Sequence, residues 1–191
     1  MIDILRKQSD GQNIAVLFLY CDYQAQKDQS AVNMIGSLLR HIALSAVGNV
    51  DEIQKSFEKS RQGGGEGLRL SEMLELFVKT TCCFERVYIC IDAMDELLPQ
   101  HRSEFLRALQ QIIQEAPNTR LFLTGRPYIR GELDKHLTKG AQIIHIVPKQ
   151  GDIARYLSRK IDDDDDRDPD LMTENLKHDI MNIMLEKASD M

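Results

Sequence analysis

An apolar segment in the middle of the chain leads into three acidic residues. Val87–Ile91 is followed directly by Asp92, and Asp95 and Glu96 lie one turn further on. An aspartate at the end of a buried strand can order a water in the shell of Mg²⁺, as it does in phosphate-transfer proteins. A neighbouring carboxylate can orient or deprotonate an attacking water. The alternative is that Asp92 caps the following turn while Asp95 and Glu96 are solvated.

A second apolar segment, Arg120–Thr124, is followed by Gly125 and Arg126, so it ends in a hydroxyl and a guanidinium. In an open parallel sheet, ligands bind outside the carboxyl ends of the strands. If both segments are strands of one sheet, the carboxylates and Arg126 face a common ligand. The alternative for Arg126 is a surface salt bridge.

The elements that must position these residues alternate along the chain. Nearly continuous apolar runs predict strands at 14–20, 87–91, 120–124 and 142–147. Apolar positions at helical spacing predict helices at 2–8, 30–42, 51–60, 71–81, 101–115, 130–137, 152–161 and 171–187. Ser30 and Ser71 are the expected N-caps, Gly11 follows a helix end, and 61–67 is a flexible loop. This alternation predicts an α/β fold with a parallel sheet and right-handed crossovers.

The net charge of −6 is local to one run of the sequence. Residues 162–170 contain seven Asp and one Arg, so the rest of the chain is electrically balanced. A balanced surface argues against nucleic-acid binding, which needs a basic patch. An EF-hand loop starting at Asp162 would need Gly and Glu where Arg167 and Thr173 stand. We therefore expect 162–170 to be a self-repelling acidic linker.

Cysteine usage and hydropathy favour a cytoplasmic protein. The four cysteines show no C-x-x-C spacing. No apolar run approaches the ~20 residues of a membrane span, and the amino terminus lacks the pattern of a secretory signal. We expect no membrane association.

Several segments together resemble one family. V-Y-I-C-I-D-A-M-D-E-L is similar to the Walker B segment of NACHT NTPases, and L-F-L-T-G-R-P to their sensor 1 segment. The strand A-V-L-F-L-Y-C-D-Y with the helix V-N-M-I-G-S-L-L-R-H-I resembles the nephrocystin-like branch common in fungal, NLR-like STAND proteins. The step from 146–148 to 156–157 resembles the start of the helices after the NTPase core. The resemblance implies a three-layer P-loop NTPase-like fold, with the core at 1–150 and a helical region at 151–191.

The family also implies roles for the candidate residues. Asp92 would serve Mg²⁺, Asp95 or Glu96 would handle the attacking water, and Thr124 and Arg126 would face the nucleotide, ATP or GTP. Full-length relatives are signal-transduction switches of innate-immunity or incompatibility type. They couple nucleotide state to oligomerisation and have protein partners through effector and repeat regions.

One departure from the family is large. The phosphate-binding loop G-x-x-x-x-G-K-[ST] should precede the first helix, but no Gly-Lys pair occurs anywhere in the chain. That loop supplies backbone N–H donors, a phosphate-pairing Lys and a hydroxyl for Mg²⁺. We therefore expect a truncated domain that lacks its first strand, does not bind Mg²⁺-nucleotide alone and is not catalytic as it stands.

The missing strand has a structural consequence. In the family it lies between the strands that correspond to 87–91 and 120–124, so we expect these two either to pair directly or to leave edges that aggregate. Direct pairing would bring Asp92 near Arg126 as a salt bridge. Two other functions stay open: a protein-interaction module that kept the NTPase fold, and a metal-dependent hydrolase of another kind.

Overall fold

The computed structural model describes residues 2–9, 11–45, 68–137, 141–147, 149–163 and 173–189. The chain divides into two compact units, Met1–Ala141 and Gln142–Met191. The predicted helix 51–60 and loop 61–67 lie outside the described residues, and so does the acidic linker from 164 onward.

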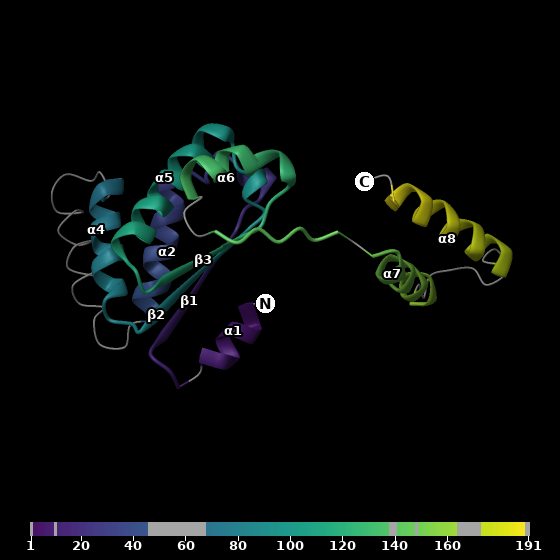
Figure 1. Ribbon diagram of the computed structural model, residues 1–191, viewed down its shortest axis with the longest axis horizontal. Coiled ribbons are helices and arrows are strands. Elements are labelled where there is room, and N and C mark those ends of the chain that lie inside the picture. The colour runs from purple at the N-terminus through teal and green to yellow at the C-terminus, as the bar shows by residue number, and fades with distance from the viewer. Residues whose placement is uncertain are drawn as a thin grey trace. The chain divides into compact units, whose positions relative to one another are not determined.

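A three-stranded parallel sheet forms the centre of the first unit (Figure 1). The strands are β1 (Ile14–Tyr20), β2 (Arg86–Asp92) and β3 (Thr119–Leu123), in the order β1-β2-β3. Their register places Leu17 beside Ile89 and Ile89 beside Leu121. β2 and β3 therefore pair directly, which is the first of the two outcomes expected for these strands.

Helices cover the sheet unequally on its two faces. The helices of the first unit are α1 (Ile2–Ser9), α2 (Ala31–Ser45), α4 (Leu70–Thr81), α5 (Pro99–Glu115) and α6 (Arg130–Leu137). α2, α4 and α5 lie on one side of the sheet and α1 on the other (Figure 1). The predicted α/β class, a parallel sheet between helices on both faces with further helices at the C-terminal end of the chain, is confirmed.

The core lies between the sheet and the three-helix side. Side chains alternate along a strand, and the alternate positions Ala15, Leu17 and Leu19 are buried. The helices contribute fully buried side chains such as Leu38, Phe77 and Phe105. Burial of an apolar side chain of this size stabilises a fold by about 1.5–3 kcal/mol, so this layer contributes strongly to the stability of the first unit.

Two of the expected helix ends are confirmed and one is wrong. Ser30 Oγ accepts a hydrogen bond from the N–H of Asn33 at 3.3 Å. Gly11 follows α1 with a φ of 73°, a conformation that glycine adopts without steric cost. The cap of α4 is Arg69 instead of Ser71, because the Glu72 carboxylate accepts a hydrogen bond from the Arg69 N–H at 2.8 Å.

The predicted fourth strand at 142–147 is wrong. Residues 141–147 form no regular secondary structure, and Ile144, Ile146 and Val147 are exposed. A strand exists only where a neighbour completes its ladder of hydrogen bonds, and apolar β-forming side chains cannot supply that neighbour.

The second unit contains two packed helices, α7 (Gln150–Asp162) and α8 (Glu174–Ser189). Lys177 Nζ lies 2.7 Å from Asp162 Oδ1 and joins them. In the described parts of the chain, no helix is long and apolar enough to cross a membrane.

Candidate functional site

The carboxyl ends of β2 and β3 bring the predicted acidic and hydroxyl groups together. Asp92 is the last residue of β2, and Thr124 directly follows β3. The Thr124 hydroxyl donates a hydrogen bond to Asp92 Oδ1 and accepts one from the Ala93 N–H at 2.9 Å. The side chain of Thr124 therefore fixes one oxygen of the Asp92 carboxylate.

A tight turn follows Asp92 and carries the other two carboxylates. Ala93 has a φ of 55°, in the left-handed region that a side chain rarely adopts. The turn η2 (Met94–Glu96) begins next, with Met94 fully buried. The Met94 N–H donates to the Thr124 carbonyl at 2.9 Å, so the turn is fastened to the end of β3.

Asp95 has a nearly buried side chain. Its side chain is 8% exposed, and its Oδ2 lies 3.5 Å from Nε of Arg126, whose own side chain is 77% exposed. Its Oδ1 accepts a hydrogen bond from the Arg126 N–H at 3.2 Å. The Tyr128 hydroxyl donates to the Asp95 carbonyl at 3.0 Å. The salt bridge of Arg126 is therefore with Asp95 instead of Asp92, because the Asp92 carboxylate is held by Thr124 while the turn brings Asp95 round to β3.

Glu96 is held by the loop that follows β1. Its Oε2 accepts a hydrogen bond from the Tyr23 N–H at 3.0 Å, and its carbonyl accepts one from Gln26 Nε2 at 2.7 Å. A hydrogen bond from a neutral N–H leaves lone pairs on the carboxylate for a further donor such as water. The Glu96 carboxylate therefore keeps acceptor sites for a solvent molecule.

Arg102, on α5, donates hydrogen bonds to backbone carbonyls of this turn. It was not predicted as a site residue. Its side chain is 5% exposed and makes a two-point ion pair with Glu132, with N···O distances of 2.8 and 2.7 Å. Nη1 also donates to the Leu97 carbonyl at 3.0 Å and to the Asp95 carbonyl at 3.3 Å. The ion pair raises the pKa of Arg102 and lowers that of Glu132. Arg102 thus joins η2, α5 and α6.

Gly125 sits where the chain passes close to the next turn. A Cβ at this position would lie 2.6 Å from Cδ1 of Ile129, which belongs to η3 (Pro127–Ile129). Ile129 is itself buried, so the absence of a side chain at 125 lets the Arg126 backbone approach Asp95.

The pKa of the Cys21 thiol reflects the negative charge of the cluster. Burial, together with the nearby carboxylates of Glu96, Asp92 and Asp95 in that order, raises the pKa of its thiol to about 12. Its N–H donates to the Asp92 carbonyl at 3.0 Å, which extends the β1–β2 ladder to the site.

We expect Cys21 to resist alkylation because the thiolate is the nucleophile. At about pH 8, iodoacetamide should modify the exposed Cys82 first and leave Cys21 unmodified, as peptide mass spectrometry would record. Because the folded pKa lies above the ordinary 9.0, this group's contribution to stability is complete below pH 9 and is lost as the pH rises toward 12. Equal labelling of Cys21 and Cys82 in the folded chain would contradict the placement.

The cluster could supply only some of the ligands of a Mg²⁺ ion, with the oxygens of a bound phosphate supplying others. In the described residues, no group of three or more His, Cys, Asp or Glu side chains could hold a metal ion. Mg²⁺ at nucleotide sites is commonly bound by one or two carboxylates and by phosphate oxygens. Asp92, exposed and with one oxygen fixed by Thr124, suits the protein side of such a site.

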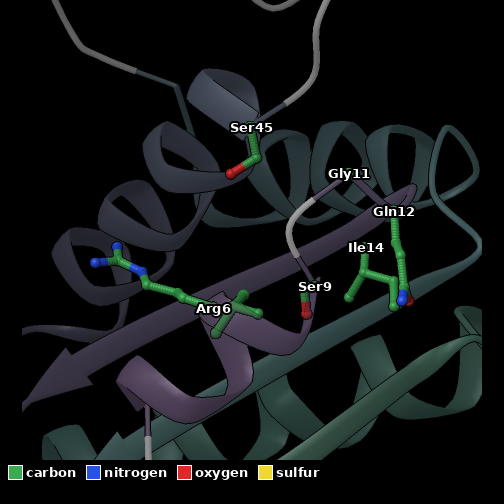
Figure 2. A pocket seen from close by; sticks show the side chains of 7 residues that line it. Arg6, Ser9, Gly11, Gln12, Ile14 and Ser45 are labelled. Atoms are coloured by element: carbon green, nitrogen blue, oxygen red, sulfur yellow. The ribbon is translucent and has the colours of Figure 1, made fainter.

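A hollow of about 310 Å³ lies away from this cluster, at the start of β1 (Figure 2). It is lined by Arg6, Ser9, Gly11, Gln12, Ile14, Val16 and Ser45. In Figure 2, the Arg6 guanidinium and the Gln12 amide lie at opposite ends of it. Its polar groups do not converge on one point, so the candidate site remains the strand-end cluster.

Comparison with known proteins identifies the family. Residues 1–126, more than half of the chain, match the family described as nephrocystin 3, N-terminal. No curated protein matches the chain. Among solved structures, the chain is similar to the Walker-type ATPase of Pyrococcus abyssi, with 12% sequence identity and a TM-score of 0.46. That match covers 94% of this chain and 60% of the ATPase. On the family match, the chain belongs to the nephrocystin 3 N-terminal family.

Proposed function

We propose that this chain is the Walker B and sensor 1 part of a NACHT-type nucleotide-dependent switch. The observation that carries the proposal is the contact between Asp92 and Thr124 at adjoining strand ends. An acidic residue held by a hydroxyl at the carboxyl edge of a parallel sheet is suited to a Mg²⁺-bound phosphate ligand. Membership of the nephrocystin 3 N-terminal family supports this function.

In this function Asp92 would hold Mg²⁺, which supplies charge neutralisation for the phosphates of ATP or GTP. Glu96 would orient the attacking water, since the Asp95 carboxylate is paired with Arg126, whereas the Glu96 carboxylate accepts a hydrogen bond from the neutral Tyr23 N–H. Arg126, with its exposed guanidinium, would meet the terminal phosphate in exchange for Asp95. Asp95 would then serve mainly to hold the turn.

The proposal includes inactivity of the chain by itself. Without a G-x-x-x-x-G-K-[ST] loop, the sequence lacks the backbone donors and the Lys that bind most of the phosphate charge. We expect Mg²⁺-ATP and Mg²⁺-GTP to bind the purified chain with a Kd weaker than about 1 mM, or −4 kcal/mol. Isothermal calorimetry checks this expectation, and a micromolar Kd would show that the phosphates are bound by other groups.

A second candidate is an interaction module that kept the fold without nucleotide chemistry. Its support is that all three carboxylates have partners within the chain: Thr124, Arg126 and the Tyr23 N–H. This module should not bind Mg²⁺-nucleotide even when a phosphate loop is joined to it. Binding by the joined protein therefore separates the two functions.

A further inference from the structure

The face of the sheet opposite α2 and α5 is open over β3 and the first residues of β2, whereas Cys90, further along β2 on the same face, is buried. We define the open half-face by four residues, Arg86 and Tyr88 on β2 and Arg120 and Phe122 on β3. Strand alternation and register place them together, with Tyr88 beside Arg120 and Cys90 beside Phe122. Arg86 and Arg120 are exposed, and Phe122 is 38% exposed although it is a large apolar residue.

α1 covers the remaining half of this face. It packs chiefly on β1 (Figure 1). Its Arg6 guanidinium lies 4.6 Å from the ring centroid of Phe18. In the described part of residues 2–137, no other helix packs on this face. Among these helices, only α1 therefore covers this face of the sheet.

The space beside α1 is about one helix wide. Strands lie about 4.8 Å apart, so β1 and β3 are roughly 10 Å apart, which is also the diameter of a helix with its side chains. The opposite face is filled in this way, with α2 on β1 and α5 on β3. A helix beside α1 would lie over β3, the strand on which α5 packs on the other face.

The charges of the open half-face specify the kind of helix. Arg86 Nη1 donates to the Tyr88 hydroxyl at 3.3 Å, and Arg120 Nη1 donates to the carbonyls of Pro117 and Thr119. Each guanidinium has five N–H donors, and the acceptors in these contacts are a hydroxyl and carbonyls. Both guanidinium groups therefore keep N–H donors that could bind a carboxylate. Glutamate or aspartate on a docked helix would complement them, and its apolar stripe would cover Tyr88 and Phe122.

We propose that the open half-face is a docking site for an amphipathic helix whose apolar stripe is flanked by carboxylates. The width of the open strip, about that of one helix, favours a helix over single-stranded nucleic acid. This inference does not depend on nucleotide binding, because none of the four residues belongs to the strand-end cluster.

The probe is a synthetic helix of about 18 residues, roughly five turns, with leucines at i, i+3, i+4 and i+7 and glutamates beside them. A twin carries lysine in place of every glutamate. In NMR titrations of the full 191-residue chain, the acidic helix should bind about tenfold or more tightly than its twin and shift the amides of 86–90 and 119–123. The double variant Arg86→Glu/Arg120→Glu should reverse this preference.

Arg107→Glu is the matched control, because it reverses an exposed arginine on α5, on the opposite face. It should leave the preference for the acidic helix unchanged, and circular dichroism should confirm that every variant folds. Failure of both helices to bind, equal binding of both, or an unchanged preference in the double variant would overturn the proposal. Tighter binding of an oligouridine than of the acidic helix, lost in the double variant, would overturn it in favour of nucleic acid.

Discussion

Replacing Arg102 with alanine should lower the free energy of unfolding by about 3 kcal/mol. The guanidinium is buried and donates to the buried Leu97 carbonyl as well as to Glu132. Its removal leaves that carbonyl without this donor and opens a cavity beneath η2. Urea unfolding of the full chain at neutral pH measures the change.

Glu132→Gln is the matched control for this variant. It keeps the shape of the side chain and removes the charge, and Glu132 is 40% exposed, so we expect a loss of only about 1 kcal/mol. Arg102 lowers the pKa of Glu132, so the ion pair contributes fully above the ordinary value of 4.5 and is lost as the pH falls through the folded pKa. An Arg102→Ala loss no larger than that of Glu132→Gln would show that the contacts with η2 contribute little.

Replacing Glu96 with glutamine should lower nucleotide hydrolysis about a hundredfold in a protein that joins this chain to a G-x-x-x-x-G-K-[ST] loop. Glutamine can still accept the hydrogen bond from the Tyr23 N–H, so the turn should stay in place. It cannot take a proton from water. Steady-state phosphate release gives the rate, and binding of Mg²⁺-ATP should change little.

The control is Glu75→Gln, which removes an exposed carboxylate on α4, a helix that contributes no residue to the strand-end cluster. It should hydrolyse nucleotide at the unaltered rate. If Glu96→Gln and Glu75→Gln were equally active, Glu96 would not be the residue that activates water.

The strands could be predicted because their apolar runs are long and their polar ends are abrupt. Predicted strands 14–20, 87–91 and 120–124 correspond to β1, β2 and β3 with shifts of at most one residue. The meeting of Asp92 with Thr124 follows from parallel topology, which places all carboxyl ends on one edge. This part of the site required no knowledge of side-chain contacts.

The supporting contacts were beyond prediction for different reasons. The donor to Glu96 is the backbone N–H of Tyr23, and every non-proline residue has such a group, so the sequence does not single it out. Arg102 did leave a signal. It lies three and four positions before Phe105 and Leu106, which places a charge on the apolar face of α5. A charged residue on an apolar helix face needs a partner, and here the partners are Glu132 and the η2 carbonyls.

The error at 142–147 has a physical basis as well. The run Q-I-I-H-I-V has the composition of a strand, but composition does not supply the neighbouring strand. The pairing of Arg126 with Asp95 was missed because it depends on the left-handed turn at Ala93, a conformation that is unusual for alanine.

The central claim is that the ends of β2 and β3 face Mg²⁺-nucleotide, and one titration tests it most directly. Mg²⁺-ATP and Mg²⁺-GTP are titrated by calorimetry into the chain joined to a G-x-x-x-x-G-K-[ST] loop, and into its Asp92→Ala variant. We predict a micromolar Kd, about −8 kcal/mol, for one of the two nucleotides, weakened at least tenfold by Asp92→Ala. Equal affinity in the presence and absence of the Asp92 carboxylate, or no binding by the joined protein in which Asp92 is intact, would contradict the claim.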